Sequence, residues 1–144
     1  MYQSINKSRI NKPRLRKAIA ALRSGKYEQG TDCLKEGCKF CVLGVLADVS
    51  GLGTWEPIKS VSHEKYYILP EFAAFPREGV TTRLNTTLQK YYGFDRTIPY
   101  IELYGELKDL VDLNDKVYKD SDGNLRSEYS FSEIADLLEK TYLN

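Results

Sequence analysis

Hydrophobic residues recur at helical spacing near both ends of the chain. The first such segment starts after Asn11, a residue type that caps helices, and stops before Gly25, a residue type that ends them. The second starts at Ser130 and Glu133, which form the S-x-x-E pattern of a capping box. Each segment therefore predicts an amphipathic helix with one buried face. The residues of the two buried faces are Leu15, Ala18, Ile19, Leu22, Phe131, Ile134, Leu137 and Leu138.

The stretch CVLGVLADVSG, residues 41–51, is apolar almost all round. A helix with that pattern lies in the middle of a protein, because every face of it avoids water. We therefore predict a central buried helix over residues 41–50, with Gly51 at its end. Gly44 inside this helix would let another backbone segment approach closely, since glycine has no side chain.

Short strands are predicted on both sides of this central helix. The sequence around Gly30 and Gly37 suits two brief strands joined by a tight turn at residues 35–37. Beyond the helix, Gly, Pro and Ser interrupt the chain, and one or two short strands are expected around Tyr66–Leu69. Asp122-Gly123 lies between polar and aromatic residues and predicts a β-hairpin.

Two further amphipathic segments predict helices. One runs from about Thr82 to Tyr92, with Gly93 as its stop, and the other runs from Ile101 to Asn114. The inward residues are Leu84, Leu88 and Tyr91 in the first segment, and Leu103, Leu107, Leu110 and Val111 in the second. The sequence thus predicts an α+β fold with four to five helices and a small antiparallel sheet.

Length and composition suit a single compact domain over residues 1–144, with residues 1–10 as a loosely ordered arm. The chain is 42% hydrophobic and 28% charged, which is ordinary for a globular protein. Its apolar runs are short, so no membrane span is expected, and the N-terminus lacks the apolar core of a secretory signal. Three cysteines close together favour a reducing cytoplasm over a disulfide framework.

Charge is distributed unevenly along the chain. Residues 1–27 carry eight Lys or Arg and no acid, whereas residues 102–144 carry eleven acids against five bases, a net charge of −6. Such a split is compatible with a nucleic-acid-binding arm at the N-terminus. We favour the alternative, in which the two ends offset each other's field, because the cations spread around a polar helix face and no recognition motif follows. Nucleic acid is therefore not an expected partner.

Cys33, Cys38 and Cys41 follow the spacing C-x4-C-x2-C, which opens one type of [2Fe–2S] motif. The chain has no fourth cysteine, and a zinc site would need His63 as its fourth ligand. Cys41 leads directly into the central helix, where a small apolar thiol packs well. We therefore expect no metal and no other cofactor at these thiols.

Other chemical motifs are weak. His63 is the only histidine, and no third group is recognisable that would orient a Cys–His nucleophilic pair. The segment that begins at Asp120 has Gly123 in the fourth position, whereas a calcium-binding loop needs glycine in the sixth. No pair of carboxylates is marked by its spacing as acid and base. The sequence therefore offers no catalytic residue, and an enzymatic activity is disfavoured.

Four segments of the chain stand out together. They are ALRSGKYEQGTDCLK, FCVLGVLADVSG, LVDLND and YSFSEIADLLE, and they cover roughly residues 20–52 and 107–140. This combination resembles a widespread group of small accessory proteins of tailed bacteriophages. The resemblance implies a location in the host bacterial cytoplasm and a role outside the virion, such as blunting a bacterial defence. Proteins of this kind either bind a defence protein or sequester its signalling molecule.

This resemblance sets three hypotheses in order. The first is a binding protein that sequesters a nucleotide-derived immune signal, such as a cyclic oligonucleotide or an ADP-ribose derivative, without chemistry. The second is a protein–protein inhibitor of a host defence or metabolic protein. The third is an enzyme that degrades such a signal. Because proteins that sequester small signals commonly place their sites between subunits, a homo-oligomer is expected as well.

A nucleotide ligand needs aromatic faces, cations and polar groups for its base, phosphates and ribose. Eleven tyrosines make stacking groups abundant. The turn after the first helix is of particular interest because it follows a rigid element, although its residues could equally cover the core and pair with backbone. The candidate ligand-binding residues are Arg23, Lys26, Tyr27, Gln29, Trp55, Tyr67, Arg83, Tyr91, Asn114 and Asp115.

Overall fold

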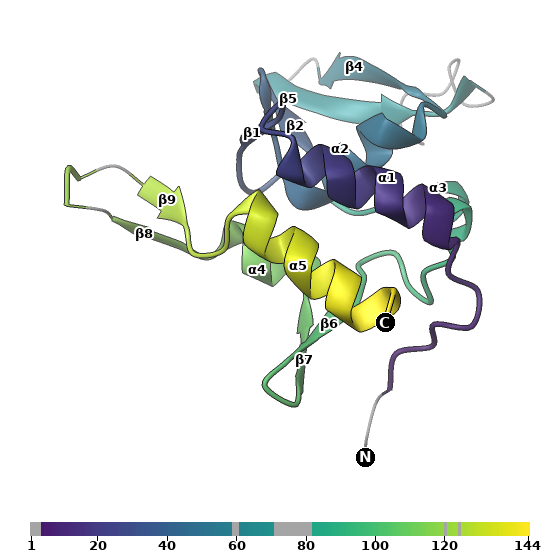
Figure 1. Ribbon diagram of the computed structural model, residues 1–144. Coiled ribbons are helices and arrows are strands. Elements are labelled where there is room, and N and C mark those ends of the chain that lie inside the picture. Colours follow the sequence, from purple (N-terminus) through teal and green to yellow (C-terminus); the bar gives the residue numbers. More distant parts are fainter. Residues whose placement is uncertain (1–3, 59–60, 71–81, 120, 124) are drawn as a thin grey trace.

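The computed structural model describes residues 4–58, 61–70, 82–119, 121–123 and 125–144 and shows one α+β domain, which confirms the predicted fold class (Figure 1). Its helices are α1 (Lys12–Arg23), α2 (Val42–Ser50), α3 (Thr86–Tyr92), α4 (Leu110–Asp115) and α5 (Phe131–Tyr142). Its strands are β1 (Glu28–Gln29), β2 (Lys35–Glu36), β3 (Lys39–Phe40), β4 (Thr54–Ile58), β5 (Val61–Ile68), β6 (Tyr100–Leu103), β7 (Glu106–Asp109), β8 (Val117–Lys119) and β9 (Leu125–Ser127).

The main sheet has five strands in the order β1-β3-β2-β5-β4. It is larger than the small antiparallel sheet that the sequence predicts, and it is mixed, because β1 runs parallel to β3 while the other neighbours are antiparallel. The hairpins β6–β7 and β8–β9 form two separate pairs that project from the helical body (Figure 1). No helix in the described part of the chain is long and apolar enough to cross a membrane.

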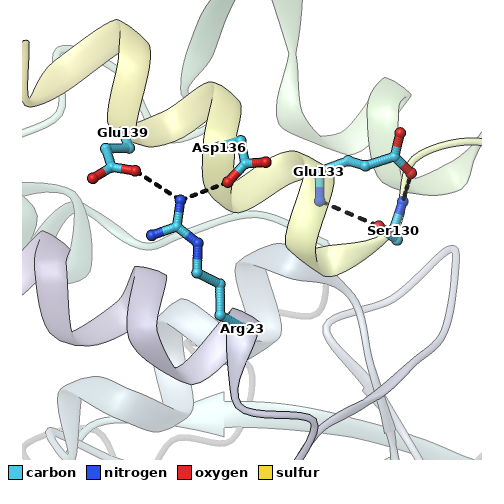
Figure 2. Close-up of polar contacts among 5 residues, drawn as sticks. All are labelled: Arg23, Ser130, Glu133, Asp136 and Glu139. Carbon is cyan, nitrogen blue, oxygen red and sulfur yellow. Dashed lines mark hydrogen bonds and ion pairs between the residues drawn. The ribbon is translucent and has the colours of Figure 1, made fainter.

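Helices α1 and α5 pack against each other, and α1 also packs against α2 (Figure 1). Both amphipathic patterns are confirmed, and their caps form as predicted: the Asn11 side chain accepts from the backbone N–H of Arg14, and Ser130 and Glu133 make a complete capping box (Figure 2). The buried faces meet in one core. Leu137 is half-buried at the edge of that core, whereas Leu138 is fully buried.

Helix α2 occupies the middle of the core, as its apolar pattern predicts. Residues 42–47 are all buried, and Gly51 ends the helix with a positive φ of 66°. The backbone of Leu34 passes so close that a Cβ on Gly44 would lie 1.9 Å from the Leu34 carbonyl oxygen. Only glycine fits here, so the predicted close approach is confirmed.

The segment after α2 contains more strand than predicted. The β4–β5 hairpin pairs Thr54 with Ile68 and continues to the pair of Ile58 with Val61. Helix α3 is shorter than predicted, since Asn85 caps it and it begins at Thr86 instead of Thr82. Residues 71–81, for which the sequence predicts loop structure, lie outside the described residues.

Within α3, the inward tyrosine differs from the prediction. Tyr92 is completely buried and donates its hydroxyl to the carbonyl of Leu46, whereas Tyr91 is half-buried. Leu88 is buried and Gly93 ends the helix in the left-handed conformation, as predicted. The prediction is therefore off by one position. The two adjacent residues are both tyrosine, so their residue type does not tell which of them faces inward.

The predicted helix over 101–114 is wrong. Its first half is the β6–β7 hairpin, and α4 covers only six residues after the cap residue Asp109. Tyr104 and Gly105 turn the hairpin with φ values of 52° and 78°, which a helix does not allow. Buried Ile101 alternates with exposed Glu102, which is the pattern of a strand. The leucines of this segment are also spaced as in a helix, and the prediction followed that spacing.

The N-terminal segment lies along the end of α3. The backbone N–H of Asn11 donates to the carbonyl of Tyr92 at 2.9 Å, and that of Asn6 donates to the Asp95 carboxylate at 3.0 Å. A Cβ on Gly93 would lie 1.8 Å from the Arg9 carbonyl oxygen. Residues 4–10, for which a loose arm is predicted, thus make defined contacts with the domain.

Replacing Gly44 should test the close approach of α2 to Leu34. An exposed helical Gly→Ala change stabilises a helix by about 1 kcal/mol, whereas overpacking a core costs about 1–3 kcal/mol. We expect Gly44→Ala to lower the free energy of unfolding by about 2 kcal/mol in urea denaturation. Ser132→Ala on the exposed face of α5 is the control and should change little. A Gly44→Ala protein as stable as the wild type would contradict the packing described above.

Candidate functional site

Three of the predicted ligand-binding residues, Gln29, Asn114 and Asp115, lie together in one hydrogen-bond network. The Gln29 amide nitrogen donates to Asn114 Oδ1 at 3.1 Å and to the carbonyl of Tyr129 at 2.9 Å. Asp115 Oδ1 accepts from the backbone N–H of Asp32 at 3.1 Å. This network joins the strand β1, the helix α4 and the segment that precedes α5.

Asn114 uses its whole hydrogen-bonding capacity inside the protein. Its Oδ1 accepts from Gln29 and from the backbone N–H of Val42 at 3.1 Å. Its Nδ2 donates to the carbonyl of Gly30 at 2.8 Å and to Asp115 at 2.9 Å. An amide offers two donors and two strong acceptor positions, and this side chain is completely buried. No group remains on Asn114 to bind a ligand.

Three more predicted residues, Tyr27, Trp55 and Tyr67, belong to a row of edge-to-face aromatic rings that also contains Phe40. The Asp48 carboxylate accepts from the Tyr27 hydroxyl at 2.5 Å and from the Trp55 indole N–H at 3.0 Å. Burial, and then the hydrogen bond to Asp48, raises the pKa of the Tyr27 phenol. The polar tips of these rings are therefore engaged within the protein.

The side chain of Lys35 lies over part of this aromatic row. Lys35 Nζ lies 4.8 Å from the Phe40 ring centroid and 5.5 Å from that of Trp55. The Tyr67 hydroxyl accepts from the backbone N–H of Gly53 at 2.7 Å. The row thus fastens the β4–β5 hairpin to β3 and α2, and its rings serve packing, which is the alternative that the sequence left open for Tyr27.

The remaining predicted residues are scattered. Arg23 bridges to Asp136 at 2.6 Å and Glu139 at 2.7 Å on α5, and hydrogen bonds to these carboxylates raise its pKa (Figure 2). The Tyr91 ring lies under the Arg14 guanidinium, whose carbon is 4.2 Å from the ring centroid. Lys26 and Arg83 are exposed. The structure does not gather these four residues into one site.

The cysteines also occupy separate positions. Cys41 caps α2, where its sulfur accepts from the backbone N–H of Gly44, and Cys38 is exposed. Burial raises the pKa of the Cys33 and Cys41 thiols to about 12. Cys33 lies with Glu36 and Glu64, and the candidate ligand atoms of these three residues are within 4.8 Å of one another. The side chain of His63 lies outside the described residues.

A cavity of about 560 Å³ lies between the N-terminal segment and the end of α3. Two cations, Arg9 and Lys90, line it. Two amides, one carboxylate, a glycine and an aromatic ring complete the lining: Asn6, Gln89, Asp95, Gly93 and Phe94. Its volume falls in the range typical of small-molecule sites. Below we call it the N-terminal pocket.

Sequence reasoning missed every residue of the N-terminal pocket. Asn6 and Asp95 are 89 positions apart, and no local motif joins them. Two signals were available in the sequence. Gly93 ends α3, and a glycine there allows another backbone segment to come close. The segment before Asn11 contains the basic residues Lys7 and Arg9. Neither signal indicates which helix end the N-terminal segment would meet.

A second cavity of about 450 Å³ lies beside α4 and the β6–β7 hairpin. Of the predicted residues, Asp115 lines it. Its cations are already paired, since Lys108 bridges to Glu106 at 3.3 Å and Lys116 bridges to Glu128 at 3.5 Å. An anionic ligand would therefore meet less uncompensated positive charge here than in the N-terminal pocket.

A comparison with protein-family models identifies the chain. Residues 8–142 match the model described as Domain of unknown function (DUF8296). The chain belongs to this family. No curated protein and no solved structure matches it. The DUF8296 match includes Arg9, Lys90 and Asp95 of the N-terminal pocket, and its description assigns no activity, so the function has to be inferred from the geometry of the domain.

Converting the buried amide of Asn114 to a carboxylate should show that the network is structural. Asn114→Asp removes two donors and places an acceptor beside Asp115 and the Gly30 carbonyl, at a cost of about 3 kcal/mol or more. Folding raises the pKa of such a carboxyl, so the loss of stability should grow as the pH rises from about 4 to about 7.

Thermal unfolding at the two pH values measures this loss. Asn85→Asp is the matched control, because aspartate caps a helix as well as asparagine does. A variant Asn114→Asp that melts like the wild type at neutral pH would show that the network contributes little to the fold.

Proposed function

We propose that this DUF8296 protein is a bacteriophage accessory protein that sequesters a nucleotide-derived immune signal in the host cytoplasm, and that the ligand occupies the N-terminal pocket. The observation that carries the proposal is the composition of that pocket. It combines two cations, two amides and a carboxylate around a cavity of suitable volume. The phage origin rests on the resemblance of the four sequence motifs.

The cations of the N-terminal pocket suit phosphate groups. Within the described part of the chain, neither Arg9 nor Lys90 forms an ion pair, whereas both lysines of the second cavity do. An anionic ligand would compensate these two charges, and Arg9 can hold a phosphate with two parallel N–H donors. This contrast favours the N-terminal pocket over the second cavity.

The neutral and acidic groups suit the base and the ribose. The amides of Asn6 and Gln89 offer both donors and acceptors, which base edges require. Asp95 Oδ2 accepts from the backbone N–H of Asn6, while Oδ1 is buried without a hydrogen bond in the described residues and lies 3.6 Å from Arg96 Nε. A carboxylate with spare acceptor capacity is a natural partner for a ribose hydroxyl.

Removing either cation should weaken ligand capture. We expect Arg9→Ala and Lys90→Ala each to weaken binding at least tenfold, because a charge-assisted hydrogen bond contributes about 1.5–3 kcal/mol. Isothermal titration with cyclic dinucleotides, cyclic trinucleotides and ADP-ribose measures the affinity. Lys26→Ala and Arg83→Ala are the controls, since both residues are exposed and do not line the pocket.

The fate of the ligand separates sequestration from degradation. A ligand released by heating should have the same mass as the ligand that was added. A changed mass would favour the third hypothesis, an enzyme that degrades the signal. Equal affinities in the pocket variants and the wild type would rule out the N-terminal pocket as the site. Light scattering, with and without ligand, tests the homo-oligomer that the sequence analysis predicts.

A second candidate function is inhibition of a host protein through the β6–β7 hairpin. Tyr104 is 96% exposed at the turn of this hairpin, which projects from the body of the domain (Figure 1). It also holds a positive φ of 52°, which is unfavourable for tyrosine. An exposed aromatic residue retained at a costly backbone position is typical of a protein-binding anchor.

Tyr104→Asn should separate the anchor from the fold. Asparagine adopts positive φ readily, and Asn-Gly is a preferred hairpin turn, so the variant should fold with equal or higher stability. If the second candidate is right, the variant should lose capture of a host protein that the wild type retains from a bacterial lysate. Glu102→Gln on the same hairpin is the control. Retention of the same host protein by both variants would contradict the candidate.

A further inference from the structure

Within the described residues, two of the eight cations in residues 1–27 have a partner. Arg23 pairs with Asp136 and Glu139 on α5, and Arg14 stacks on Tyr91 and donates to its carbonyl at 3.0 Å. Among the described residues, the other six cations form no ion pair and no hydrogen bond through their side chains. They are Lys7, Arg9, Lys12, Arg16, Lys17 and Lys26.

Three of these free cations lie on one exposed side of α1. Lys12, Arg16 and Lys17 are exposed, while the opposite side buries Leu15 and its neighbours. Lys12 and Arg16 are one turn apart, where like charges repel each other. Lys7 and Arg9 lie in the segment directly before the helix. Below, Lys7, Arg9, Lys12, Arg16 and Lys17 are called the basic face.

The basic face is electrostatically costly for the isolated protein. The first turn of α1 contains no acidic residue, so no side chain of that turn compensates the cations. Lys12 and Arg14 instead add positive charge to the end of the helix that already carries the positive pole of its dipole. The acids of α5 do not reduce this cost, since the two that pair with α1 both bind Arg23 at its other end. A polyanionic partner would remove the cost.

We propose that the basic face binds the phosphate backbone of duplex DNA, independently of base sequence. Helix α1 has 12 residues and is therefore about 18 Å long, and a duplex carries one charge per about 1.7 Å of its axis. Several phosphates thus lie within reach of the face at once. Duplex is favoured over single strands because the Tyr91 ring beside α1, which could stack on a base, is already covered by Arg14.

The uneven charge distribution along the sequence allows two explanations, and the structure favours a polyanionic partner over mutual compensation of the two chain ends. Mutual compensation of the two chain ends explains Arg23, and the contacts with Tyr91 explain Arg14, but the other six cations have no partner in the described residues. This inference does not depend on ligand capture by the N-terminal pocket, because the two cations tested below, Arg16 and Lys17, do not line that pocket.

Charge reversal on the basic face tests the proposal. The probe is a fluorescein-labelled DNA duplex of about 30 base pairs, and fluorescence anisotropy measures its affinity over a range of salt concentrations. Neutralising about four to six phosphates predicts a plot of log K against log salt with a slope of about −4 to −5. The double variant R16E/K17E should weaken binding at least tenfold in about 50 mM salt and reduce the slope by about 2.

A matched control keeps the test independent of net charge. K108E/K119E changes the net charge by the same amount on the two hairpins that project from the body, and it should bind like the wild type (Figure 1). R16E/K17E should melt at the same temperature as the wild type or higher, because a glutamate in place of Arg16 would attract Lys12 instead of repelling it.

Three outcomes would overturn the proposal. The first is the absence of measurable duplex binding in about 50 mM salt. The second is an equal loss of affinity in the control and in R16E/K17E, which would make net charge and not the basic face responsible. The third is tighter binding to phosphatidylserine vesicles than to the duplex, which would make a membrane surface the partner. Ligand titration with R16E/K17E should meanwhile give the wild-type affinity for any nucleotide that the pocket binds.

Discussion

One buried amide connects parts of this domain that lie far apart in the sequence. Asn114 contacts the end of β1, the start of α2 and the segment before α5, either directly or through Gln29. Its neighbour Asp115 holds the backbone of Asp32, which has a positive φ of 75°. Because every donor and acceptor of Asn114 is used, a shift of any one of these segments would leave a buried polar group without a partner.

The sequence predicts the elements whose signals are local. The caps at Asn11 and Ser130, the apolar run of α2 and the glycine that ends it depend on neighbours within a few residues. The prediction for residues 101–114 is wrong because the leucines there fit a helix while the other residues fit a hairpin. The turn at Tyr104-Gly105 decides between them, and tyrosine is a rare residue at positive φ.

The candidate site was harder to predict, because the sequence does not tell whether a polar group is satisfied inside the protein. Gln29, Tyr27 and Asn114 have the chemistry that a ligand needs, but the structure directs their polar atoms to Asp48, to backbone groups and to one another. The N-terminal pocket depends on tertiary structure, since Arg9 and Lys90 meet only when the N-terminal segment lies on α3. Residues so far apart in the sequence form no motif.

The pairing of α1 with α5 has a consequence for how the protein is made. Arg23 and Asp136 are 113 positions apart, and the two helices that carry them pack directly against each other. During synthesis, α1 leaves the ribosome with the apolar face of Leu15, Ile19 and Leu22 uncovered long before α5 exists. Because this contact joins distant parts of the chain, it forms late, and the core cannot close while α5 is still being made. Until then the apolar face of α1 is a surface that a chaperone can bind or that can drive aggregation of the nascent chain.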